Sequence, residues 1–288
     1  MATLRSIRRR IASVKKTQQI TRAMQMVAAA KLLRAQENAL KARPYGQKLS
    51  EVVKSLVIRT RPEGHPLLRK REENKVSIVV ITSDRGLCGG FNINILTKAT
   101  QFLKERKEKG CQVDLVIMGR KGIVFFHRTG EEIRREYRNV LGMADYTSAT
   151  IIARDLIEDY LREAVDSIYL VYNQFKSAMQ QRVVEERLLP IQEEGLEEGL
   201  SPVEYIYEPK ENEILDLLLP RHIEYQTFSA ILESTASEFA ARMTAMDMAT
   251  RNAKDMIDRL TLYFNRARQE AITKELMDIV GGAEALQK

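Results

Sequence analysis

The sequence lacks any apolar run that approaches the roughly 20 residues needed by a membrane-spanning helix. It also has only two cysteines in 288 residues. Cys88 and Cys111 fit neither a disulfide framework nor a metal site, so we interpret them as small buried hydrophobes of a reducing compartment. The basic start, MATLRSIRRR, has no apolar segment or small-residue cleavage site behind it, which argues against a secretory signal. We therefore expect a soluble intracellular protein.

Acidic residues are almost missing from the first 54 positions. This segment has 13 lysines and arginines against Glu37 and Glu51, a net charge of +11, so the other 234 residues carry −4 of the chain's total of +7. A basic segment of this kind usually meets nucleic acid, anionic lipid or an acidic protein surface. We predict a salt-sensitive contact with an acidic protein through its basic face, which we define as Arg8, Arg9 and Arg10.

Glycine and proline are scarce at both ends of the sequence. The first segment has no proline before Pro44 and no glycine before Gly46. Steps of three and four between its apolar residues predict a long helix with one apolar stripe, which Pro44 can kink. The stripe is predicted to contain Leu4, Ile7, Ile11, Val14, Ile20, Met24, Val27, Ala28, Leu32, Ala35 and Ala39.

The second glycine-poor and proline-poor segment is the 60 residues between Pro220 and Gly281. Its three-four spacing continues over about five heptads, which is typical of a left-handed coiled coil. The predicted seam contains Ala236, Phe239, Met243, Met246, Thr250, Ala253, Ile257, Leu260, Phe264, Ala267 and Ala271.

The middle of the sequence alternates between apolar strands and helical stretches. Strands are predicted at 76–82, 113–119, 167–175 and 183–191, and helices at 93–107 and 147–164. Residues 192–199 are predicted to form an acidic surface loop. This order indicates an α/β layer with a largely parallel sheet. The predicted fold class is therefore α/β: a Rossmann-like foot domain at 75–210, with an antiparallel two-helix coiled coil formed by helices at 1–58 and 211–288.

Candidate chemistry is sparse. The turn SDRGLCGGFN (83–92) follows a strand and opens a helix, where dinucleotide folds bind phosphate, but its glycine spacing matches neither GxGxxG nor GxxxxGK[ST]. His65, His127 and His222 are scattered and lack the spacing of a metal site or catalytic triad. We therefore predict no catalytic residue, cofactor or metal. Two alternatives stay open: an enzyme that binds a nucleotide at 83–92, and a coiled-coil adaptor for nucleic acid, against which no aromatic residue interleaves with the basic charges before Tyr45.

Three segments resemble the γ subunit family of rotary ATP synthases. They are RSIRRRIASVKKTQQITRAMQMVAAAKL (5–32), TSDRGLCGGFN (82–92) and ARMTAMDMATRNAKDMIDRLTLYFNRARQEAITKELMDIVGGAEAL (241–286). The similarity runs from end to end, and the C-terminal motif is highly specific. The sequence has no dithiol loop of the chloroplast type and no organellar transit peptide, both of which favour a bacterial enzyme.

The resemblance implies a non-catalytic shaft that passes torque from the membrane c-ring to the β sites of an α/β hexamer. It implies the ε subunit and the c-ring as further partners, and a peripheral location at the cytoplasmic face of the bacterial membrane. No nucleic acid is implied as a partner. Positions that match β-contacting residues are Met24, Arg242, Gln269 and Thr273.

Two further sets of residues follow from the resemblance. The bearing tip lies within 271–285, where apolar residues can turn in a smooth sleeve; we define it by Ile272, Leu276, Ile279 and Val280. The foot turn is assigned a structural role only and is defined by Arg85, Gly86, Gly89 and Gly90.

Overall fold

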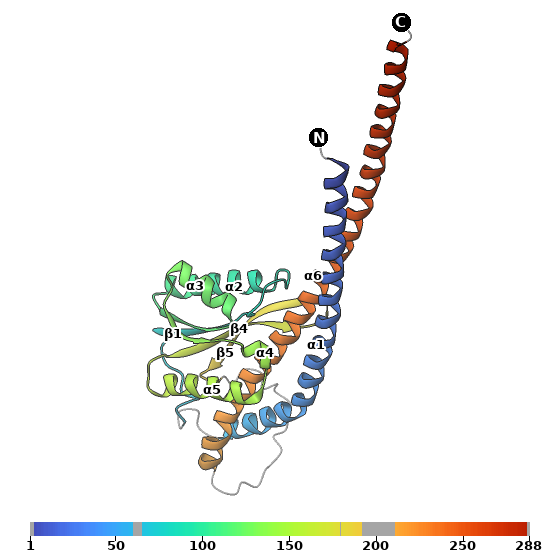
Figure 1. Ribbon diagram of the computed structural model, residues 1–288. Helices are drawn as coiled ribbons and strands as arrows, with labels where there is room; N and C mark the ends of the chain where they lie inside the picture. Colours follow the sequence, from blue (N-terminus) through green and yellow to red (C-terminus); the bar gives the residue numbers. More distant parts are fainter. Residues whose placement is uncertain (1–2, 60–64, 179, 192–210, 287–288) are drawn as a thin grey trace. The chain divides into compact units, whose positions relative to one another are not determined.

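The computed structural model describes residues 3–59, 65–178, 180–191 and 211–286 (Figure 1). The chain forms two compact units, described here one at a time. We call Met1–Val27 with Met243–Lys288 the helical unit, and Ala28–Arg242 the sheet unit. The acidic loop predicted at 192–199 lies outside the described residues.

Two helices account for almost half of the chain. Helix α1 is Leu4–Arg59 and helix α6 is Glu211–Leu286, which confirms the two long helices expected from the scarcity of glycine and proline. Pro44 lies inside α1 and Pro220 inside α6. Each proline removes one backbone hydrogen bond, yet both helices continue through it because the neighbouring turns are held by packing.

The sheet unit is built on five strands in the order β3-β2-β1-β4-β5. They are β1 (Lys75–Ile81), β2 (Gln112–Met118), β3 (Ile133–Tyr137), β4 (Ser167–Phe175) and β5 (Gln181–Leu189). The pairs β1–β2, β2–β3 and β1–β4 are parallel, whereas β4–β5 is antiparallel. After its first residue β1 is buried throughout, as expected for a strand covered on both faces.

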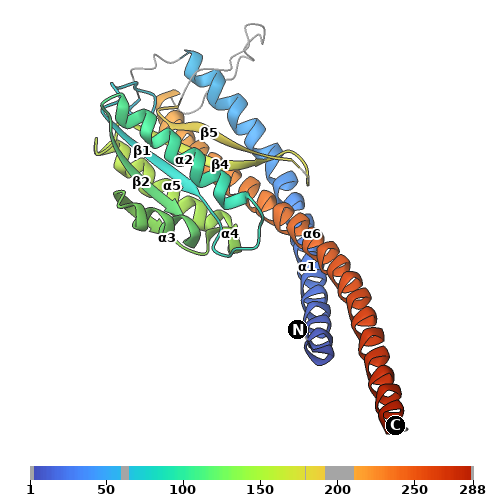
Figure 2. The ribbon, with the colours of Figure 1, turned by 90° about the horizontal axis from the view of Figure 1, so that it is seen from above.

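Helices cover both faces of this sheet. Figure 1 shows α2 (Phe91–Glu108) and α3 (Arg120–Thr129) on one face and α5 (Tyr146–Leu161) on the other. Figure 2 shows the sheet from the side of α2. The first half of α6 runs beside α5, where Tyr146 and Arg154 both reach Glu224. The short α4 (Val140–Met143) precedes α5. Neither α3, β3 nor α4 was among the predicted elements.

The packed core of the sheet unit extends beyond the limits 75 and 210 that were expected for the foot domain. Leu49, Val53 and Leu56 of α1 belong to the same buried cluster as the strands, and so do Leu219 and Ile223 of α6. The expected limits follow the strands, but the apolar stripes of both helices bury themselves against the sheet layer. The core therefore includes parts of the two long helices.

In the helical unit, α1 and α6 run antiparallel. The Oγ1 atoms of Thr21 and Thr250 lie 2.8 Å apart, and Gln25 Nε2 donates to Asp247 Oδ1 at 3.0 Å. Nearer the start of α1, the Arg8 guanidinium lies 5.4 Å from the ring centroid of Phe264. As the chain advances along α1, its partners therefore move backward along α6.

The seam of α1 differs from the predicted stripe at two positions. Ile20 and Val27 are 59% and 57% exposed, whereas Thr21 is buried and Gln25 is half-buried. A strict three-four register that starts at Leu4 reaches position 21 and then 25, and it bypasses 20 and 27. The prediction was wrong here because it followed hydrophobicity, while hydrogen bonds to α6 place polar residues on the seam.

Candidate functional site

The foot turn joins β1 to α2 and is held by its own side chains. Ser83 Oγ donates to the carbonyl of Arg85 at 2.6 Å, and the Asn92 amide donates to Ser83 Oγ at 2.8 Å while its oxygen accepts from Ser83 N at 3.0 Å. Leu87 and Gly89 have φ of 63° and 55°. Gly89 takes this left-handed conformation at little cost, so the turn is tight for structural reasons.

Asp84, beside the foot turn, and Gly119 make close contacts near the carboxyl ends of β1 and β2. Asp84 Oδ1 accepts from the backbone amides of Arg120, at the start of α3, and Asn139, at 3.0 and 3.1 Å. Its carboxylate thus lies at the N-terminus of α3, where a negative charge is favoured. Gly119 lies so close to the end of β1 that a Cβ there would be 2.0 Å from the carbonyl oxygen of Thr82.

Cys88, inside the same turn, is buried. Burial raises the pKa of its thiol, opposed by a hydrogen bond with Ser83 and by the charge of Arg242. A thiol with a raised pKa is a poor nucleophile. This fits the structural role expected for Cys88.

Arg242, expected to contact a partner, is engaged within its own chain. Its guanidinium pairs with Glu238 at 2.6 Å, and the two side chains are only 11% and 7% exposed. Nη2 also donates to the carbonyls of Gly86 and Arg85 at 3.2 and 3.4 Å. Arg242 therefore fastens the foot turn to α6, with burial raising the pKa of Glu238 and Arg242 opposing that rise.

Beyond Ala271, α6 exposes every described side chain as far as Val280. The four residues of the bearing tip are between 49% and 68% exposed. Gln269 and Thr273 are exposed too and line a shallow groove on α6 together with Arg266 and Met277. The end of α6 thus presents a mixed apolar and polar surface with no packing partner within the described part of the helical unit.

In α1, Met24 is half-buried and precedes Gln25, which donates a hydrogen bond to Asp247. The three arginines of the basic face, near the start of α1, are exposed. The structure brings Gln269 and Thr273 together, since they share one helix face. The sequence analysis missed the polar pairs Thr21–Thr250 and Gln25–Asp247. It also missed Glu238 as the partner of Arg242, although the four-residue spacing on a helix was a usable signal.

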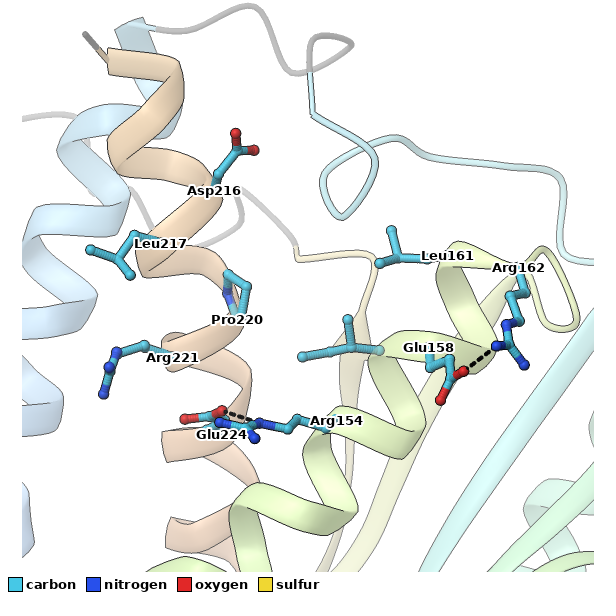
Figure 3. Close-up of a pocket in the computed structure, with 10 residues that line it drawn as sticks. Arg154, Glu158, Leu161, Arg162, Asp216, Leu217, Pro220, Arg221 and Glu224 are labelled. Atoms are coloured by element: carbon cyan, nitrogen blue, oxygen red, sulfur yellow. Dashed lines mark hydrogen bonds and ion pairs between the residues drawn. The ribbon is translucent and has the colours of Figure 1, made fainter. Parts of the chain in front are cut away.

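A second surface of the sheet unit is the groove between α5 and the first half of α6 (Figure 3). Arg154 Nε lies 3.4 Å from Glu224 Oε1 across the groove, and Arg162 pairs with Glu158 along α5. Leu161 and Leu217 are exposed beside these pairs. Most charges of the groove are therefore balanced locally, and its apolar side chains are open to contact.

Within the described residues, no three His, Cys, Asp or Glu side chains gather as a metal site would require. None of the helices in this part of the chain is both long and apolar enough to span a bilayer.

Comparison with known proteins decides the family. A family model described as ATP synthase matches residues 3–286. The ATP synthase gamma chains of Geobacter metallireducens and Geotalea uraniireducens are each 51% identical to this chain over 288 residues, and the matches cover all of both chains. The chain belongs to the ATP synthase gamma chain family.

Solved structures agree with this gamma chain fold. The rotor of the mitochondrial ATP synthase of Euglena gracilis matches with a TM-score of 0.66 at 22% identity, covering 93% of this chain and 98% of that one. A second structure from that organism, of OSCP, F1 and the c-ring, gives 0.67 at 22%, covering 98% and 94%. At this identity the likeness concerns the fold alone, which is the predicted arrangement of two long helices and an α/β domain.

Proposed function

We propose that this gamma chain is the rotor of a bacterial, proton-transporting F-type ATP synthase. It is a non-catalytic subunit that transmits torque between the membrane c-ring and the catalytic β sites of the α/β hexamer. The bearing tip is the observation that carries this proposal. A helix end with exposed apolar residues and no partner helix costs free energy in water unless another surface covers it. A ring of α and β subunits supplies such a sleeve.

Torque requires that the shaft be asymmetric. A rotor changes the conformation of a β subunit only through unequal affinity for its states, as any ligand does. Met24 and the face with Gln269 and Thr273 are the proposed β contacts. A methionine suits a sliding contact, because its thioether is polarisable and lacks a strong directional partner.

Arg242 is also a proposed β contact, with one condition. Its guanidinium is shared between Glu238 and the carbonyls of the foot turn. To bind β it must exchange one of these partners for a group on β. The same residue would then report the state of the foot turn to the ring.

The sheet unit is the proposed foot, which binds the ε subunit and rests on the c-ring at the cytoplasmic face of the membrane. Leu161 and Leu217 in the α5–α6 groove supply apolar surface for such a contact, and the paired charges of the groove supply polar surface around it. This arrangement resembles the general anatomy of protein interfaces, with an apolar centre and a polar rim.

The test is reconstitution with purified α and β subunits. The gamma chain alone is expected to hydrolyse no ATP, and activity should appear when all three subunits are combined. A variant that ends after Ala271 should bind the ring more weakly, because it lacks the bearing tip. The proposal would be contradicted if the gamma chain alone hydrolysed ATP after contaminants were removed. It would also be contradicted if the ATPase activity of the α and β subunits were the same with and without the gamma chain.

A further inference from the structure

A cavity of about 380 Å³ lies inside the sheet unit between α1, the end of β4 and the first half of α6. This volume falls within the usual range of small-molecule sites, roughly 300–1,000 Å³. Its apolar lining includes Phe175, Leu232 and Leu40, which is 63% exposed, so the cavity is partly open to solvent. Its polar groups include Arg43 and Glu233.

Three consecutive residues of α1 lie next to the cavity in the sequence, and two of them contact Tyr225 of its lining. Pro44 has no amide hydrogen to donate to the carbonyl of Leu40, so the helix loses one bond beside the cavity. Tyr45 packs edge-on against Tyr225 with ring centroids 5.9 Å apart. At Gly46 a Cβ would lie 1.8 Å from Cζ of Tyr225, so only glycine lets that ring approach. The helices are thus close at Tyr225, while the next turns leave the cavity open.

Glu233 gives this cavity its chemistry. Its Oε2 is buried and finds no hydrogen-bond partner among the described residues. Burial raises the pKa of Glu233, and the nearby charge of Glu186 raises it further. A hydrogen bond from the backbone of Phe175 and the charges of Lys176 and Arg43 oppose the rise, while Oε2 keeps no donor of its own. Glu186 already accepts a hydrogen bond from Tyr172 at 2.8 Å. A buried acceptor left without a donor is unusual and calls for an explanation such as a ligand.

We propose that this cavity binds a small amphipathic amine. The ammonium group donates to Glu233 Oε2, and the apolar body packs against Leu40, Phe175 and Leu232. An anion is disfavoured because it would bring a second acceptor to Glu233 Oε2 instead of a donor. A neutral apolar molecule would fill the space but leave Oε2 without a donor. One positive charge fits, because Arg43 at the same cavity opposes a second. The proposal does not depend on the rotor function.

The experiment compares 2-phenylethylamine with 2-phenylethanol, which match in size and differ in the donor group. Binding to the full-length chain is measured by calorimetry and by ligand-observed NMR. We expect the amine to bind at least tenfold more tightly than the alcohol. In Glu233→Gln this preference should vanish, while Glu158→Gln, which changes an acid on α5 outside the cavity, should keep it. Ala39→Leu, which narrows the cavity, should weaken both ligands.

Equal binding of the two ligands would overturn the proposal, as would amine binding that persists in Glu233→Gln. The absence of binding by either ligand would also overturn it and indicate a water-filled cavity. If Glu233→Gln does not fold, as judged by circular dichroism, Ala39→Leu decides, because amine binding unchanged in that variant places the ligand elsewhere.

Discussion

His222 provides a stability switch whose direction and size follow from its surroundings. The ring is 5% exposed in α6, and the Gln226 amide nitrogen lies 2.9 Å from its Nε2. Because that amide donates, Nε2 accepts, and the proton of the neutral ring resides on Nδ1, which has no partner among the described residues. Burial, and secondly the charge of Lys54, lowers the pKa of His222 from 6.5 to about 4.

The sign of the pH dependence follows directly. The unfolded chain takes up a proton near pH 6.5, before the folded chain does, so the contribution of His222 is fully present above pH 6.5 and is lost as the pH falls toward 4. Between the two pKa values of a single group, each pH unit changes the free energy of unfolding by about 1.4 kcal/mol. Over this interval the free energy of unfolding should therefore decrease by about 3 kcal/mol because of His222 alone.

The assay is urea unfolding from pH 7.5 to 4.5, followed by the near-ultraviolet circular dichroism of the tyrosines. His222→Gln keeps a polar side chain of similar size but cannot titrate. The difference in free energy between parent and variant should be constant above pH 6.5 and shift in favour of the variant below it. Subtraction removes the contributions of the carboxylates and of His65, whose pKa is also lowered by burial.

His127→Gln is the matched control, since its ring lies on the surface beside Glu136. It should not reproduce the gain of the His222 variant at low pH. Parallel curves for the parent and His222→Gln throughout the range would refute the reasoning, because they would mean that His222 is protonated as readily in the folded protein as in the unfolded one.

Three other changes test the shaft and the sheet. Met24→Lys should impair proton pumping per ATP more than assembly, because an ion pair between the lysine and β would stabilise one rotor angle. The stabilisation is up to about 1 kcal/mol if the pair is exposed, and more if it is partly desolvated. Vesicle assays at several temperatures test this, and normal pumping per ATP would mean that Met24 is an ordinary packing residue. Reversing the basic face to glutamate should weaken assembly at 0.1 M salt and matter little at 1 M, where the screening length falls to about 3 Å; assembly unchanged at every salt concentration would mean that these charges are merely solvated. Gly119→Ala, with a φ of 94° and its Cβ 2.0 Å from Thr82, should cost about 3 kcal/mol or more in urea unfolding. Gly110→Ala, at φ 84° with open space around it, should cost about 1 kcal/mol, and equal losses would contradict the role of that contact.

Both long helices and four of the five strands could be predicted from the sequence because their signals are local. The scarcity of glycine and proline predicted both long helices, and the apolar runs predicted β1, β2, β4 and β5. The seam of α1 was harder. Whether Thr21 or Ile20 faces α6 depends on Thr250, which is 229 residues away. Hydrophobicity within α1 contains no trace of that partner.

Strand β3 illustrates the second kind of information that the sequence hides. Its residues IRREY are mostly charged and do not resemble a buried strand. Arg134 donates to Asp114 of β2 at 2.6 Å, and Arg135 donates to Asp159 of α5 at 2.7 Å. These bonds satisfy the charges of an edge strand, and charged side chains also protect such an edge from pairing with other chains. The pattern makes sense only once the neighbours are known.

Arg242 shows the limit for the candidate site. The family resemblance implies that Arg242 contacts β, and that contact stays a prediction. Within its own chain the guanidinium of Arg242 binds Glu238 and the carbonyls of the foot turn. A sequence motif marks a residue as special without saying which neighbour it serves. The four-residue spacing to Glu238 was visible, but the foot turn lies more than 150 residues away along the chain.

The burial of α6 changes along its length in a way that matches the proposed division of labour. In the sheet unit the helix buries a broad face, with Leu219, Ile223 and Ile231 in the main core. In the helical unit the covered face narrows beyond Thr250. From Arg251 to Ala271 the buried or half-buried residues are Ala253, Ile257, Leu260, Phe264, Ala267 and Ala271. From Ile272 to Val280 every side chain is exposed. Because most helical stability in proteins comes from packing, these last turns would gain stability from a partner outside the chain that covers them. The residues that gain least from their own fold are therefore those that a surrounding ring would stabilise most.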